Sequence, residues 1–348
     1  MDMDIKKAQM TRRDALRNLI TFPLISMNLS AFSQGKQRIK TTHPEDILAQ
    51  CAAGIAACRE ISRGTDSSDL ALAFDGVSAY MPVLKTMIKE SPLYRKKAAN
   101  LVAQCARVKT VLGRIGWQQE NLQQATMYAQ EAVTFAREAD DPALLISSQL
   151  SLAWVYYYDH RNQQGLRALR EALSVYKQEH SLPHTLEVRI YGAQAVLDAK
   201  TGQQPKEALR FAHTALRKVT NNDYFVFSDA IVPELIGDEA LAYYHARDYP
   251  KATETFSQLI NPEDLTMKQP LSGKAYAEML NFMTLASLKN PKKDMKATLH
   301  LWDSAIKGAK KLQSRQRFEE VRAAYDLMDV LWAGEKEVED RREFVMQW

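Results

Sequence analysis

The chain has 348 residues, with 46 basic and 42 acidic side chains and a formal net charge of +4. Because this charge is small and both signs are mixed along the sequence, it gives no reason to expect direct nucleic-acid binding. Glycine (13 residues) and proline (12 residues) are sparse, which favours an all-α protein over a sheet protein.

Residues 1–42 form a basic and then apolar segment ahead of the helical region. The stretch TRRDALR at 11–17 resembles the twin-arginine export motif, with alanine in place of the motif's phenylalanine. This resemblance implies export and cleavage near Ser33. The alternative is a docking helix that folds onto the first helical hairpin through Leu16, Leu19, Ile20, Leu24 and Ile25. The apolar stretch, interrupted by Pro23, is too short for a stable membrane span.

The three cysteines are Cys51, Cys58 and Cys105. An odd number cannot all pair within one chain, and we interpret them as small buried residues. Because free thiols are typical of a reducing compartment, they favour a cytoplasmic protein, with twin-arginine export as the alternative.

From residue 43 onward, prolines recur where helices are expected to start, and apolar residues follow the helical period between them. This pattern predicts a domain of antiparallel helical hairpins over residues 43–348. The predicted pairs are 44–62 with 67–90, 92–117 with 119–139, 142–160 with 163–180, 184–201 with 205–220, 227–247 with 250–260, 272–289 with 294–312, and 315–333 with 335–347.

The clearest hairpin covers residues 144–179, where small and large apolar residues alternate at fixed offsets. The residues that carry this pattern are Leu152, Ala153, Tyr156, Gly165, Leu169 and Ala172. Their spacing resembles the tetratricopeptide repeat, TPR, and weaker copies recur at 112–132, 195–215, 240–259 and 285–305. The resemblance implies an α-solenoid of TPR-like hairpins, whereas the alternative is an irregular helical bundle.

A second resemblance concerns long helical-repeat chains preceded by a short R-R-x-x-L-[KR] stretch. Such chains are similar to the sensory regions of bacterial helix-turn-helix transcriptional regulators. The resemblance implies a regulatory role, as the sensor of a transcription-control system. No helix-turn-helix can be fitted before residue 44, so a DNA-reading module is not expected in this sequence. The alternative role is an exported scaffold or adaptor protein.

No catalytic or cofactor motif is present: the sequence has no nucleophile elbow, dinucleotide or Walker loop, zinc-protease motif or Cys-x-x-Cys pair. We therefore expect neither an enzyme nor a cofactor or metal. A hydrolase built on helical repeats would need clustered carboxylates in a closed pocket, and Asp238 with Glu239 is the candidate pair.

The first helices of stacked hairpins form a concave groove that can take a peptide or another protein. Arginine and aromatic side chains at inward positions are those that dominate binding energy. The oligomeric state is left open. The predicted groove residues are Arg107, Arg114, Trp154, Tyr157, Gln194, Asp238 and Tyr244.

Overall fold

The computed structural model describes residues 17, 18, 20, 43–118, 120–221, 223 and 231–346. Regular structure in these residues is helical, apart from two isolated bridges, Trp117 to Ser314 and Ile260 to Met267. The helices run in the order α2 (Pro44–Ile61), α3 (Ser67–Glu90), η2 (Pro92–Tyr94), α4 (Arg95–Arg114), α5 (Leu122–Ala139), α6 (Pro142–Tyr158), α7 (Asn162–Gln178), α8 (His184–Lys200), α9 (Lys206–Leu216), α10 (Ile231–His245), α11 (Tyr249–Phe256), α12 (Gly273–Lys289), α13 (Met295–Leu312), α14 (Arg315–Leu331), α15 (Lys336–Glu339) and α16 (Arg342–Met346).

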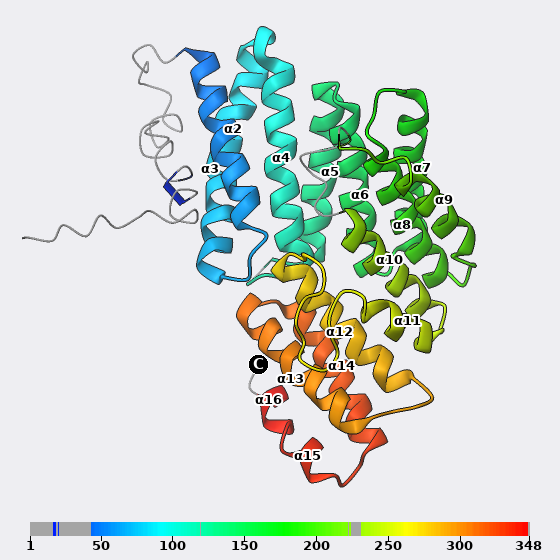
Figure 1. Ribbon diagram of the computed structural model, residues 1–348. Helices are drawn as coiled ribbons and strands as arrows, with labels where there is room; N and C mark the ends of the chain where they lie inside the picture. Colours follow the sequence, from blue (N-terminus) through cyan, green and yellow to red (C-terminus); the bar gives the residue numbers. More distant parts are fainter. Residues whose placement is uncertain are drawn as a thin grey trace, which may run out of the picture.

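The helices pack as hairpins stacked side by side (Figure 1). Each even-numbered helix from α2 to α12 packs against the odd-numbered helix that follows it. The even-numbered helices also contact one another in succession from α2 to α14, so they form the inner layer of the stack. The predicted all-α solenoid of TPR-like hairpins is therefore confirmed.

One predicted helix differs from the structure. Residues 335–347 were expected to form a single closing helix, but α15 and α16 are separated by a turn at Arg341. In this segment Val338 is the residue that reaches the core, at 1% exposure. Arg341 forms two hydrogen bonds with the Asp303 carboxylate, at 2.8 and 2.6 Å. One buried side chain and two ion pairs, the second between Arg342 and Asp329 at 3.5 Å, anchor the segment without requiring a continuous amphipathic helix.

Polar side chains at the helix starts explain why the hairpins begin where they do. Asp141 caps α6 by accepting a hydrogen bond from Leu144 N, and Pro142 occupies the first turn of that helix. Asn121 and Gln124 form a reciprocal capping box at the start of α5. Such caps satisfy backbone N–H groups that have no partner inside the helix.

The small residues of the repeat pattern lie where helices approach closely. A Cβ atom built on Gly113 of α4 would lie 2.9 Å from the Cβ of Ala125 on α5. One built on Gly165 of α7 would lie 3.3 Å from the Ala153 carbonyl oxygen of α6. The pattern therefore corresponds to real packing contacts within the hairpins.

This packing predicts a difference between two helical glycines. Gly113→Ala should destabilise the protein by about 1–3 kcal/mol, because the added methyl group overpacks the contact between α4 and α5. Gly308→Ala in α13 is the matched control, since its Cβ would approach the Ala277 methyl group only to 3.4 Å. There the higher helix propensity of alanine should leave stability unchanged or raise it by up to about 1 kcal/mol. Urea denaturation of both variants tests this, and equal effects would contradict it.

Three residues of the N-terminal segment lie within the described part of the chain, and two of them contact the first hairpin. Ile20 is fully buried, and its carbonyl oxygen accepts a hydrogen bond of 3.0 Å from the Tyr80 hydroxyl of α3. Arg17 forms an ion pair of 2.8 Å with Asp69, also on α3. Ser33 and the proposed cleavage site lie outside the described residues.

The C-terminal hairpins return to contact the turns of the N-terminal ones (Figure 1). The tight turn between α13 and α14 lies against the turn after α4, where Arg315 N donates to Gly116 O at 3.1 Å and the Ser314 hydroxyl donates to Ile115 O. Gly116 has a φ of +62°, which glycine adopts without strain. At the start of α12, Gly273 N donates to Arg63 O at 3.2 Å. The start of α12 therefore contacts the end of α2, and this contact closes the inner face of the stack.

Candidate ligand-binding site

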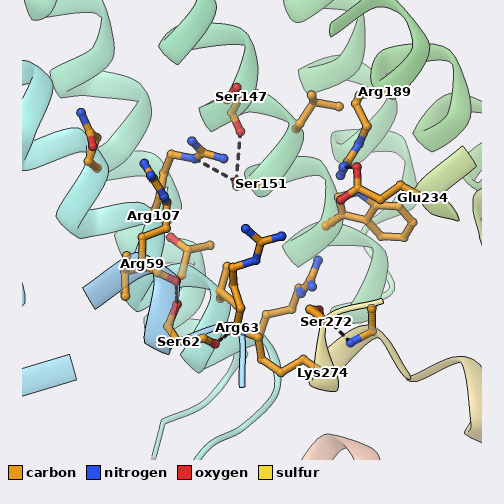
Figure 2. A pocket seen from close by; sticks show the side chains of 18 of the residues that line it. Arg59, Ser62, Arg63, Arg107, Ser147, Ser151, Arg189, Glu234, Ser272 and Lys274 are labelled. Atoms are coloured by element: carbon orange, nitrogen blue, oxygen red, sulfur yellow. Dashed lines mark hydrogen bonds and ion pairs between the residues drawn. The ribbon is translucent and has the colours of Figure 1, made fainter. Parts of the chain in front are cut away.

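The inner helices enclose a hollow of about 230 Å³ between α2, α4, α6, α8, α10 and α12. Figure 2 shows side chains from these separate elements around one space. Its lining combines apolar side chains, serine hydroxyls and charged groups. The charged lining residues are Arg59, Arg63, Arg107, Arg114, Arg189, Lys274, Glu234 and Glu278.

Helix geometry places the cations in this hollow. Arg59 lies in the last turn of α2, and Arg63 follows four residues later. Arg107 and Arg114 lie seven residues apart on α4, close to two helical turns, so they share one face. Beside Arg63, Lys274 from the first turn of α12 donates to Ser62 O and ties α12 to the end of α2 (Figure 2).

The serines and the acidic residue Glu234 engage some of these cations. Arg107 Nε is 3.5 Å from the Ser151 hydroxyl, which in turn donates to Ser147 O at 3.0 Å (Figure 2). Arg189 of α8 forms an ion pair with Glu234 of α10. These contacts orient the guanidinium groups toward the hollow.

Arg114, two turns further along α4, contacts an aromatic ring of α6. Its guanidinium group lies 5.6 Å from the ring centroid of Tyr158. Its Nε atom is buried and has no hydrogen-bond acceptor among the described residues. A buried donor without an acceptor is costly, so a bound anion or polar group at this point would be stabilised.

A smaller hollow of about 110 Å³ adjoins the first and shares six of its lining residues, among them Arg114 and Trp154. It contains Asp238, whose side chain packs against Gly192 and is 8% exposed. Burial raises the pKa of the Asp238 carboxyl from its ordinary value of 3.8 to about 7, and the neighbouring Arg189 opposes this rise.

The pKa of Asp238 predicts a pH dependence of stability. Between pH values of about 4 and 7 the folded protein keeps a proton on this carboxyl that the unfolded chain has released, so its contribution to stability declines as the pH rises. Asp238→Asn removes this titration. The stability of the variant relative to the wild type should therefore increase from about pH 4 to pH 7 and then level off. Urea denaturation at several pH values measures it, and parallel curves would contradict the assignment.

Beside the hollow, a buried polar network connects the inner helices to α14. Arg317 of α14 is 1% exposed, and its Nη1 lies 3.0 Å from Glu320 and 3.7 Å from Glu278. The Tyr158 hydroxyl of α6 donates to Glu278, and Asn281 Nδ2 donates to Glu320 at 2.7 Å. Since Glu278 also lines the hollow, the network joins the site to α14.

Four of the predicted groove residues are brought together by the structure. Arg107, Arg114 and Trp154 line the larger hollow, and Asp238 lines the adjoining one. Trp154 is half-buried and packs edge-on against Tyr157, with ring centroids 5.2 Å apart.

The other three predicted residues line neither hollow. Tyr157 is 2% exposed, and its hydroxyl lies 2.7 Å from His245 Nε2. Tyr244 is 9% exposed and accepts a hydrogen bond from Lys289. Both tyrosines are core residues, because the inner helices contact each other directly at the level of their last turns. Gln194 is hydrogen-bonded along its own helix to Asp198, at 3.4 Å.

Sequence reasoning missed Arg59, Arg63, Arg189 and Lys274. The repeat pattern begins only at residue 112, after the first hairpin, and in α8 it predicts Gln194 as an inward residue. That residue lies five positions after Arg189 and hence about 140° around the helix. A continuous helical period through α8 would have found Arg189, but nothing in the sequence indicates that Lys274 meets α2.

The carboxylate pair considered for a hydrolase does not form one site. Asp238 faces the smaller hollow, whereas the Glu239 carboxylate lies 3.1 Å from His213 Nε2 and accepts a hydrogen bond from the Tyr243 hydroxyl. Consecutive helical residues point about 100° apart, so these two carboxylates face different surroundings. Within the described residues no group of three or more histidine, cysteine, aspartate or glutamate side chains is placed to hold a metal ion.

Comparison with known proteins supports the fold. No family model matches the chain, and no curated protein sequence matches it significantly. Among solved structures it is similar to NprR in complex with its cognate peptide NprX, with a TM-score of 0.53 and 15% sequence identity over 96% of this chain and 87% of that chain. At this identity the similarity concerns the fold. A search of the described helices finds none whose length and hydropathy would suit it to cross a membrane.

Proposed function

We propose that the protein is a non-enzymatic, peptide-binding module whose ligand occupies the hollow on the inner face. The observation that carries this proposal is the hollow itself, in which cationic, hydroxyl and apolar side chains from six inner elements converge. Concave sites in which polar groups from several elements converge beside apolar side chains are typical of ligand binding. NprR, which shares the fold, has been solved in complex with a peptide.

A regulatory role follows from how the site is assembled. A ligand in the hollow would contact α2 and α4 on one side and α12 on the other, and these helices meet across the closure of the stack. Binding would stabilise the closed arrangement over any more open one. The resemblance to the sensory regions of transcriptional regulators implies the same role, with DNA binding supplied by another module.

Selection from a peptide mixture tests this function. Purified protein is incubated with a mixture of short randomised synthetic peptides, separated by size exclusion, and the retained peptides are identified by mass spectrometry. We expect a defined subset to be retained and to be released when the protein is unfolded. Retention of no peptide above the level found with an unrelated helical protein would contradict the proposal.

We also propose that the N-terminal segment is a docking element, not a cleaved export signal. The burial of Ile20 against α3 and the ion pair between Arg17 and Asp69 support this, because cleavage near Ser33 would remove both contacts. The intact mass of the protein isolated from its cells decides between the two. A mass that corresponds to cleavage near Ser33 would favour the exported scaffold.

A further inference from the structure

We infer that the hollow selects its peptide through a carboxylate group, so that the preferred ligands are acidic peptides. This inference rests on the proposed function and names the class of peptide. It is carried by the charge of the lining and by the geometry of the arginines.

The charged lining of the larger hollow is strongly unbalanced. Six cationic side chains but only two carboxylates, Glu234 and Glu278, line it among the described residues. Both carboxylates already have cationic neighbours, because Glu234 pairs with Arg189 and Glu278 lies 3.7 Å from Arg317, which is not part of the lining. Arg63 is paired as well, at 3.4 Å from Glu60, which lies outside the lining. Cationic side chains nevertheless outnumber carboxylates in this partly buried lining, where charges interact more strongly than in water, so it would attract an anionic ligand.

Four of the lining arginines come from two helices that contact each other, α2 and α4. Arg59 and Arg63 at the end of α2 face the same space as Arg107 of α4 (Figure 2), and Arg114 of α4 lines it too. Guanidinium groups present planar pairs of donors that match a carboxylate, so neighbouring arginines form a favourable carboxylate site. The buried Nε of Arg114 is a donor to which such a ligand could supply the acceptor.

The apolar part of the lining favours a peptide over a small inorganic anion. It includes Leu150, Trp154 and Leu186, and Trp154 is half-buried. A phosphate or sulfate ion would leave this apolar surface in contact with water. A peptide would cover it with a neighbouring side chain while its carboxylate binds the arginines. The expected ligand thus has an acidic group close to a large apolar residue.

A peptide offers a carboxylate from two sources, the side chain of aspartate or glutamate and the C-terminus. The peptide selection is therefore run in parallel with two mixtures of the same composition, one with free C-termini and one with C-terminal amides. Enrichment of aspartate or glutamate among retained peptides from both mixtures assigns the site to an acidic side chain. Retention from the free-acid mixture with little or none from the amide mixture assigns it to the C-terminus. Either result supports the inference.

The same experiment separates failure of this inference from failure of the proposed function. Equal retention from the two mixtures without acidic enrichment would overturn the carboxylate proposal while leaving peptide binding intact. No retention from either mixture would contradict the proposed function itself. The affinity of a retained acidic peptide should also fall by about tenfold or more when the salt concentration is raised from about 0.05 to 0.5 M, because salt screens the attraction. An affinity independent of salt would count against a cationic site.

Discussion

Replacing Arg317 by methionine should lower the free energy of unfolding by about 3–5 kcal/mol, one of the largest effects expected of any single substitution in this chain. Arg317 is 1% exposed and neutralises Glu320 and Glu278, which stay buried when the guanidinium group is removed. Burial already raises the pKa of Glu320, and the charge of Arg317 opposes that rise. Methionine fills a similar volume, so most of the loss is electrostatic. Urea denaturation at neutral pH measures it.

A combined variant separates the loss of charge compensation from the loss of packing. Adding Glu278→Gln and Glu320→Gln to Arg317→Met removes the two carboxylates, while glutamine can still accept hydrogen bonds from Tyr158 and Asn281. We expect this triple variant to regain most of the lost stability, because an uncharged network has no unpaired buried charge. A loss below about 1 kcal/mol for Arg317→Met alone would show that the group behaves like a surface ion pair.

Reversing the charge of Arg107 should weaken the binding of an acidic peptide by about a hundredfold or more. A hydrogen bond to a charged group contributes about 1.5–3 kcal/mol, and glutamate at this position adds repulsion of the ligand carboxylate. Arg107 is half-buried and lines the hollow, so the melting temperature of Arg107→Glu is measured alongside to show that the fold is kept. Titration calorimetry with a peptide retained from the selection measures the affinity.

Arg322→Glu is the matched control for this substitution. Arg322 is exposed on α14 and lines neither hollow, so the same charge change there should leave binding within about twofold of the wild type. Equal weakening by both variants would mean that net charge, and not the site, attracts the ligand. Arg114 is less suitable for this test, because its guanidinium group lies over the Tyr158 ring and its substitution would also disturb packing.

The network around Arg317 also offers a route from the proposed ligand to α14. Glu278 lines the hollow and lies close to Arg317. The guanidinium groups of Arg317 and Arg114 both lie over the Tyr158 ring, at 5.0 and 5.6 Å from its centroid. A carboxylate bound by Arg114 would compete with Glu278 for positive charge. We therefore expect occupation of the hollow to shift the position of α14, the response that the proposed sensory role requires.

The sequence by itself determined the helices and their pairing, because these depend on local interactions. Prolines and polar caps mark the helix starts, and small residues such as Gly113 and Gly165 are needed where two helices of a hairpin, or neighbouring hairpins, approach closely. The same helical period predicts which residues of the clearest hairpins point inward, among them Arg107, Arg114 and Trp154.

The tertiary structure alone decided the closure of the stack and the composition of the site. The contacts between Gly273 and Arg63 and between Ser314 and Ile115 join residues about two hundred positions apart, and no local pattern encodes them. That closure buries Arg317 and brings Lys274 to the hollow. Small rotations between successive hairpins add up along the stack, so where its two ends meet depends on every interface between them.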